Sequence, residues 1–269
     1  CSSSTTWTSS LATPAASSPS TTVASSPMRP PSSRWPIPRC GSSLSVNPTL
    51  RPEPAMLEIR NLSVAIEGTP ILRNVGLAVP TGQMVGLIGR NGAGKTTLMR
   101  SIMGLMKPTG GNIRFDDTDL TATDAYRRAH LAIGYMPEDR RLVPDLTVEE
   151  NVLTPVWATK QPNPQARLEW VYSLMPEVKG FASRRAMSLS GGQQKLAALA
   201  RALMIGKKVL LLDEPFEGVA PTLCRRLVEV ISSLKTEGIS VLISESDYTH
   251  TRGVVDRSYV IERGSVTQG

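Results

Sequence analysis

The sequence predicts an α/β fold in which a mostly parallel β-sheet is flanked by helices. A glycine-rich loop joins a short apolar run to a candidate helix, and later apolar runs alternate with segments of helical periodicity. Strands that alternate with helices form a parallel sheet covered on both faces. Partly alternating runs near residues 57–79 add an N-terminal antiparallel β subdomain. Because residues 138–188 show helical patterns only, we also expect an inserted helical subdomain there.

The first 55 residues differ from the rest in composition. They contain 10 of the 21 prolines and 15 serines, and no acidic residue precedes Glu53. Because they show no apolar period, they have no core to offset the entropy of ordering, so we expect a disordered Ser/Pro/Thr-rich tail. Two other interpretations stay open. The segment resembles an Arg- and Ser-rich organellar transit peptide, or it precedes the native start, since Met56 opens the first patterned segment.

Charge and cysteine content limit the classes of function. The net charge is +7, of which the tail supplies +3, while the 26 basic and 22 acidic residues from Met56 onward give +4. So modest an excess does not indicate a nucleic-acid partner. The sequence contains no apolar run of 18 residues, the minimum for a membrane-spanning helix. Cys1, Cys40 and Cys224 have neither metal-ligand nor disulfide spacing, which fits a reducing, cytoplasmic setting.

Apolar periodicity places the elements of the first half. Partial alternation predicts antiparallel strands over Leu57–Val64 and Val75–Val79, and a continuous apolar run predicts a buried strand over Met84–Gly89. A helix is expected from Thr96 to Leu105. A strand, a helix and a strand then follow over Ile113–Phe115, Thr123–Leu131 and Ala132–Met136.

Helical spacing dominates the second half. Thr147 and Glu150 form a capping-box pattern, so a helix begins there. Two more helices are indicated by apolar residues at i, i+3, i+4 and i+7, in the sets Leu168, Val171, Tyr172, Met175 and Leu196, Leu199, Ala200, Leu203. The remaining elements are a strand, a helix and two strands, over Val209–Leu212, Leu223–Leu234, Ser240–Ile243 and Tyr259–Ile261.

The stretch from Gly89 to Thr96 reads G-x-x-x-x-G-K-T, the pattern of a phosphate-binding loop. Its glycines let backbone N–H groups converge on phosphate oxygens, and the following helix adds its positive end. Lys95 would carry a charge to the β- and γ-phosphates, and the Thr96 hydroxyl would ligate Mg²⁺. The expected nucleotide-binding residues are Gly89, Arg90, Asn91, Gly92, Ala93, Gly94, Lys95, Thr96 and Thr97.

Two carboxylates end the apolar strand Val209–Leu212. Ligands bind at the carboxyl ends of strands in open parallel sheets. Asp213 is therefore placed to hold Mg²⁺, and Glu214 to act as the catalytic residue that polarises the attacking water.

The segment Leu189–Gln193 reads L-S-G-G-Q and precedes a helix. Ser190 is a suitable N-cap, and Gly191 and Gly192 leave N–H groups bare at a positive helix end. We expect an anion site formed by Ser190, Gly191, Gly192 and Gln193, although alone the segment would be a plain helix cap.

Together the segments GRNGAGKT, LSGGQ and LLLLDE resemble the ATP-binding subunit of an ABC transporter, with the P-loop NTPase fold of the ABC type over residues 56–269. The resemblance implies a head-to-tail dimer with a second ABC ATPase subunit, identical or not. ATP and Mg²⁺ would lie between the phosphate loop of one subunit and the Ser190–Gln193 segment of the other. The helical subdomain would dock on transmembrane permease subunits at the inner face of the plasma membrane, where the protein would be cytoplasmic and peripheral.

Longer stretches narrow the resemblance. The segments Gly134–Leu142, Pro144–Asn151 and Asp213–Pro221 are similar to the F-type ATPase of branched-chain amino-acid uptake systems. This group implies ATP-driven import of branched-chain amino acids or related small solutes. A periplasmic or extracellular solute-binding protein would then be a further partner.

Several residues depart from the family pattern. Glu138 stands where most members have a Gln that senses Mg²⁺, and an anion there still contacts a cation. Ser246 takes the catalytic position where most have a His that contacts the γ-phosphate, and His250 is not expected to replace it. Ile66 lies near the position of an adenine-stacking aromatic residue, so we expect weaker binding of the base. Ala220 occupies a dimer-contact position where many members have Asp.

Three alternatives remain beside an importer ATPase. One is a non-transport ATPase. Relatives that act on ribosomes carry two cassettes, and those that act on DNA carry a long heptad insert, but residues 56–269 contain neither feature. A nucleotide-gated module with low turnover is compatible with Ser246 and Ile66. An exporter ATPase differs in its permease-docking surface, which the sequence does not reveal.

Overall fold

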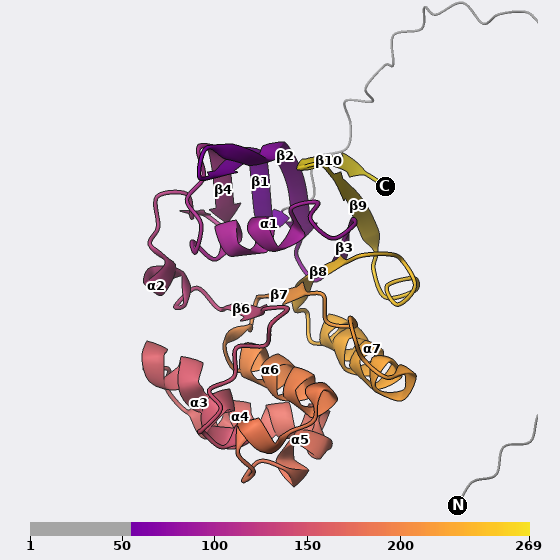
Figure 1. The fold of residues 1–269 in the computed structure, drawn as a ribbon. Coiled ribbons are helices and arrows are strands. Elements are labelled where there is room, and N and C mark those ends of the chain that lie inside the picture. Colours follow the sequence, from indigo (N-terminus) through magenta and orange to yellow (C-terminus); the bar gives the residue numbers. More distant parts are fainter. Residues whose placement is uncertain (1–54) are drawn as a thin grey trace, which may run out of the picture. The chain divides into compact units, whose positions relative to one another are not determined.

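A computed structural model describes residues 55–269, which form two β-sheets and their covering helices (Figure 1). The tail predicted over residues 1–55 lies outside the described residues, except for Ala55, where the first strand begins.

An antiparallel sheet contains the first two strands of the described chain, together with β4 and β5. Its order is β2-β1-β4-β5, with bounds Thr69–Pro80, Ala55–Ile66, Gly110–Phe115 and Thr118–Asp119. Strands β1 and β2 extend beyond their predicted limits because a two-residue turn pairs Ile66 directly with Thr69. Glu67 and Gly68 both have positive φ in this turn, the geometry that matches the twist of paired strands. The predicted antiparallel subdomain is confirmed.

The second sheet carries the functional loops. Its order is β10-β9-β3-β8-β7-β6, with bounds Ser265–Gln268, Arg257–Glu262, Met84–Ile88, Ser240–Glu245, Val209–Asp213 and Ile133–Met136. All neighbours are parallel except β10, which pairs antiparallel with β9. The central strands β3, β7 and β8 are buried along their whole length, as expected of strands covered on both faces. This confirms the predicted parallel sheet.

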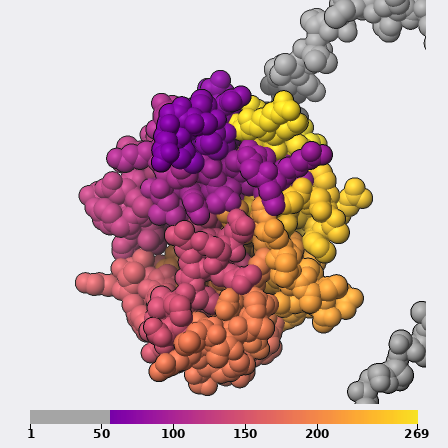
Figure 2. Space-filling model, in the orientation of Figure 1, coloured from indigo at the N-terminus to yellow at the C-terminus, as the bar shows by residue number. Residues whose placement is uncertain are grey.

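The last strand links the two sheets. Strand β10 was not predicted, because Ser265–Gln268 is largely exposed and shows no apolar run. The Arg73 N–H donates to the Gly264 carbonyl at 2.7 Å, so the turn before β10 lies against β2. Figures 1 and 2 show this arrangement as yellow C-terminal residues beside indigo N-terminal ones.

Within residues 55–269, eight helical segments cover and extend the sheets. The α-helices α1 to α7 span Lys95–Ile102, Ala125–Arg128, Val148–Thr159, Pro164–Leu174, Pro176–Gly180, Gly191–Ile205 and Pro221–Thr236, and a 3₁₀ turn spans Ala186–Ser188. Helix α2 is a single turn, shorter than the predicted Thr123–Leu131. Within α2, the buried Arg128 donates hydrogen bonds to carbonyls of Ser101 and Ile102, which fixes it against the end of α1.

Helices α3 to α6 gather on one side of the parallel sheet, away from the antiparallel sheet (Figure 1). Their shared core includes Val152, Val171, Val178 and Leu199, all fully buried. Between residues 138 and 188 the structure has helical segments and no strand. No described helix is long and apolar enough to cross a membrane.

Candidate functional site

The predicted phosphate loop lies between β3 and α1 and depends on glycine for its path. Gly94 has a φ of 111°, and a Cβ atom there would lie 2.8 Å from the Leu72 side chain. A Cβ atom on Gly89 would lie 2.3 Å from the Ile261 carbonyl oxygen. Both positions therefore exclude a side chain, one for conformational and steric reasons and the other for steric reasons alone.

Lys95 is folded back over this loop. Its ammonium donates to the carbonyl of Gly89 and to that of Arg90, the latter at 3.2 Å. The Nζ atom also lies 3.0 Å from Oε1 of Glu214, and both side chains are almost fully buried. The structure thus joins the loop lysine to the carboxylate that follows β7.

Asp213 ends β7 and is fully buried beneath the loop. The Ser244 hydroxyl donates to its Oδ1 at 2.6 Å, and the Tyr135 hydroxyl lies 3.4 Å from its Oδ2. Burial raises the pKa of Asp213, while hydrogen bonds from Ser244, Thr96 and Tyr135 act in the opposite direction. The structure thus brings together the Thr96 hydroxyl and the Asp213 carboxylate, the two groups that the sequence analysis assigned to Mg²⁺.

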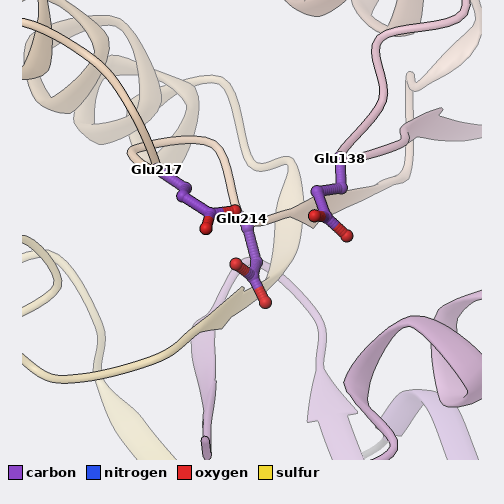
Figure 3. A group of neighbouring side chains, drawn as sticks. All are labelled: Glu138, Glu214 and Glu217. Atoms are coloured by element: carbon purple, nitrogen blue, oxygen red, sulfur yellow. The ribbon is translucent and has the colours of Figure 1, made fainter. Parts of the chain in front are cut away.

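Three glutamates converge beside this carboxylate. The carboxylate oxygens of Glu138, Glu214 and Glu217 lie within 4.8 Å of one another, and Figure 3 shows Glu138 approaching from a separate segment. Burial and the charges of Glu214 and Asp213 raise the pKa of Glu138. A hydrogen bond with Glu214, followed by burial, raises the pKa of Glu217. Carboxylate and hydroxyl oxygens are the donors that Mg²⁺ prefers, so the residues present fit this cation.

Sequence reasoning missed Glu217 and also Lys195. Lys195 is buried in α6 and donates to the carbonyls of Glu214, at 2.8 Å, and of Glu217. It thereby stabilises a turn in which Glu214 adopts a φ of 48°, a left-handed conformation that is costly for this residue type. Only the tertiary structure reveals this contact, because the helical pattern alone marks Lys195 as one more residue of α6.

A pocket of about 470 Å³ opens over the loop. It brings together eight of the seventeen predicted site residues, from three separate segments, with two isoleucines of the β1–β2 hairpin. Its lining consists of Ile66, Ile71, Asn91, Gly92, Gly94, Lys95, Thr96, Thr97, Glu138 and Glu214. Ile66 is 40% exposed, so the pocket has one apolar end beside its charged end.

The Ser190–Gln193 segment is not part of this lining. It forms the first turn of α6, where Ser190 Oγ accepts from the Gln193 N–H at 3.3 Å and Gln193 Oε1 accepts from the Ser190 N–H at 3.1 Å. The predicted N-cap is therefore a complete capping box. Ser190 and Gly191 are exposed, so the segment faces outward rather than into the pocket of its own chain.

Ser246 lies on the other side of the phosphate loop. Its hydroxyl donates to Asn91 Oδ1 at 2.9 Å, and it lines a hollow of about 620 Å³ with the loop residues from Gly89 to Ala93. His250 instead packs its ring against Phe216, with centroids 5.5 Å apart, and does not line either cavity beside the loop.

Comparisons with known proteins match this chain to one family and to several relatives. Residues 72–217 match the family described as ABC transporter. A probable ABC transporter ATP-binding protein of Azorhizobium caulinodans is 39% identical over 76% of this chain and 73% of its own length. BraG of Pseudomonas aeruginosa, a high-affinity branched-chain amino acid transport ATP-binding protein, is 35% identical over 78% of this chain and 91% of its own. The lipopolysaccharide export system ATP-binding protein LptB of Escherichia coli K12 is 34% identical over 78% of this chain and 88% of its own length.

A solved structure of similar fold is a dimeric ATP-binding cassette in a post-hydrolysis state, bound to ADP and Pi. It is 25% identical, with a TM-score of 0.72, and the match covers 80% of this chain and 98% of the other. A second is an ATP-binding cassette in its ADP conformation. It is 27% identical, with a TM-score of 0.69, and the match covers 80% of this chain and 91% of the other.

Proposed function

Because the chain belongs to the ABC transporter family of ATP-binding proteins, we propose that it is the ATP-hydrolysing subunit of an importer for branched-chain amino acids or related small solutes. The observation that carries the ATPase part is the meeting of Lys95, Asp213 and Glu214 at the phosphate loop. Similarity to BraG supports the importer part. The ATPase domain would span residues 56–269, with its helical subdomain over about 138–188.

Binding of ATP would use the whole length of the pocket. The residues from Gly89 to Thr97 would hold the phosphates with backbone N–H groups and the Lys95 ammonium. Ile66 and Ile71 line the apolar end and would contact the base without aromatic stacking. The γ-phosphate would replace the Glu214 carboxylate as the partner of Lys95, leaving Glu214 able to accept a proton from the attacking water. Ser246, beside Asn91, would donate to the same phosphate.

The oxygen donors at the carboxyl end of β7 would hold the cation of the nucleotide. Thr96 and Asp213 would be its direct or water-linked ligands, and Glu138 would approach it from a separate segment. When bound, Mg²⁺ neutralises charge that develops on the transferring phosphoryl group. The nearby charge of Lys95 would act in the same direction.

A second ATPase subunit would complete each site. Ser190–Gln193 lies outside the pocket of its own chain, yet it presents an exposed helix N-terminus suited to anions. In a head-to-tail dimer this segment of one chain would close over ATP held by the other. The solved cassette that is dimeric and bound to ADP and Pi supports the dimer itself.

The transmembrane partners would bind an apolar groove on a different face. A groove of about 430 Å³ is lined by residues of α1, α3, α6 and the segment between α1 and α3, among them Met103, Leu105, Ile133, Pro155, Ala158 and Ile205. Leu105 and Trp157 of this region are more than half exposed. Permease subunits docked there would hold the protein at the inner, cytoplasmic face of the membrane, and a solute-binding protein outside would supply the solute.

Steady-state ATP hydrolysis tests the ATPase part. The full chain should hydrolyse ATP in a Mg²⁺-dependent manner, and Lys95→Ala should lose ATP binding because the phosphates lose their mobile cation. Lys107→Ala, which removes an exposed lysine beyond α1, is the matched control. Retained affinity of Lys95→Ala in a nucleotide titration would overturn the phosphate-loop assignment. Binding by the native chain without turnover would instead favour a nucleotide-gated module.

The importer part can be tested by replacing a relative with this chain in the relative's own organism. Similarity to LptB makes an exporter ATPase the second candidate. This chain would replace BraG in Pseudomonas aeruginosa and, separately, LptB in Escherichia coli K12. Recovery of leucine uptake in the first strain, absent for Lys95→Ala, is the expected result. Recovery of lipopolysaccharide export in the second strain alone would favour the exporter.

A further inference from the structure

The loop Glu138–Arg141 touches both halves of the proposed catalytic machinery. At one end, Glu138 lines the nucleotide pocket of its own chain. Two residues later, the Arg140 guanidinium lies beside Gly191, where a Cβ atom would be 3.6 Å from its Nη1. In the proposed dimer, these two ends would serve different ATP molecules.

The loop is held in a costly backbone conformation. Arg140 and Arg141 have φ values of 61° and 48°, both in the left-handed region, which non-glycine residues rarely adopt. The Arg201 guanidinium of α6 donates to the carbonyls of Arg140 and Arg141, the latter at 2.6 Å. A conformation of this kind persists only when surrounding contacts stabilise it, and the two hydrogen bonds from Arg201 attach the loop to α6.

Arg140 reaches the Ser190–Gln193 segment through one side chain. Its Nη1 donates to Gln194 Oε1 at 3.1 Å. The Gln194 amide lies 3.4 Å from the Leu189 carbonyl, which directly precedes Ser190. Among the described residues Arg140 has no ion pair, and its Nε is buried without a partner. Its side chain is therefore fixed by Gln194 rather than by a carboxylate.

We propose that Arg140 is a positioning residue that couples the nucleotide pocket of a chain to the Ser190–Gln193 segment which that chain presents to its partner. The inference rests on the proposed function. When ATP draws Glu138 into its place, Arg140 and Gln194 hold the first turn of α6 in the position that the second ATP requires. Binding of one ATP then favours binding of the other.

The test is the cooperativity of ATP binding in the full chain carrying Glu214→Gln, which separates binding from turnover. At protein concentrations where the dimer forms, this parent should bind ATP with a Hill coefficient above one and at most about two, the number of sites. Arg140→Ala and Gln194→Ala should each lower the coefficient to about one, and the double variant should lower it no further because both act through one contact. Binding to dilute monomers should stay within about twofold of the parent.

Arg141→Ala is the matched control, because Arg141 lies in the same loop but directs its side chain to Asp139. It should keep the cooperativity of the parent. Parent-like cooperativity in both Arg140→Ala and Gln194→Ala would overturn the proposal, as would an equal loss in Arg141→Ala. Should Arg140→Ala unfold, Gln194→Ala decides alone. Loss of ATP binding in the parent itself would instead refute the proposed function, and the coupling with it.

Discussion

At the scale of single residues, the buried ion pair Lys95–Glu214 contributes little to stability, and this points to a functional role. Both side chains are nearly inaccessible and lie 3.0 Å apart. Moving two charges out of water costs several kcal/mol each, so such a pair adds little net stability. Its role is better explained by ligand exchange. An incoming phosphate can replace the Glu214 carboxylate, because it offers Lys95 an equivalent anionic partner.

Glu245 gives a prediction about pH. Burial raises the pKa of this carboxyl from 4.5 to about 7, although the Phe216 N–H donates to it at 3.0 Å. Between these values the folded chain holds a proton that the unfolded chain releases. The stabilisation is fully present below pH 4.5 and is lost as the pH rises through 7, a decrease of at most about 3 kcal/mol in the free energy of unfolding. Urea unfolding at pH 5 and pH 8 should show this decrease.

Glu245→Gln should remove this part of the pH dependence, since glutamine is neutral at both values and keeps an acceptor for the Phe216 N–H. Asp247→Asn is the control, because Asp247 is exposed two residues away. A native chain and a Glu245→Gln variant with the same pH profile would show that Glu245 is ionised in the folded protein throughout.

Among the site residues, those with a fixed local pattern were predictable and those with a tertiary role were not. The glycines, Lys95 and Thr96 follow one another in a single loop, so their spacing alone identifies them. Ser244 and Lys195 reach the site only because β8 lies beside β7 and α6 packs under the turn after β7. Neither residue differs from its neighbours in any local signal.

At the scale of secondary-structure elements, two helices begin with the same device. Thr147 caps α3 and Ser190 caps α6, each by a reciprocal box with the residue three positions later. The complete box of Thr147 and Glu150 was predicted from the sequence. For α6, Ser190 was predicted as the N-cap, but the reciprocal bond to Gln193 was not. Strand β10 and the short α2 differ from expectation for another reason. Their limits come from pairing with β9 and from the carbonyls that Arg128 contacts, and neither is visible in local periodicity.

The two caps allow stability to be separated from function. Ser190→Ala and Thr147→Ala should each lower the free energy of unfolding by about 1 kcal/mol, because each leaves an N–H at a helix start without its acceptor. Thermal unfolding measures this effect. Only Ser190→Ala should also weaken ATP-dependent dimerisation in the Glu214→Gln background, as followed by light scattering.

Thr147→Ala is thus the internal control for a general loss of stability. Equal weakening of the dimer by both substitutions would mean that helix stability, and not contact with nucleotide, accounts for the effect of Ser190.

At the scale of the whole molecule, the separation of the pocket from Ser190–Gln193 has a consequence that neither segment has alone. If each ATP is shared between two chains, a defect in the loop and a defect in the α6 terminus affect different sites of a mixed dimer. Gly191→Asp is a suitable second defect, because a Cβ atom there meets only the Arg140 guanidinium, at ordinary distances. The added carboxylate disables the α6 terminus in two ways, since it repels phosphate and can pair with Arg140. An acidic residue at this position also favours the helix, so folding should be preserved.

Lys95→Ala and Gly191→Asp should each be inactive in ATP hydrolysis, yet their mixture should be active. In a mixed dimer, the intact loop of the Gly191→Asp chain meets the intact α6 terminus of the Lys95→Ala chain, and this pairing restores one site. Random association makes half of the dimers mixed, so up to about a quarter of the native sites should return if the sites act independently. The control is the native chain mixed with an equal amount of a chain that carries both substitutions. Its mixed dimers contain no intact site, so only native homodimers remain active, and the activity should fall to about half of what the same amount of native chain gives alone. A mixture no more active than either variant alone would contradict a site shared between two chains.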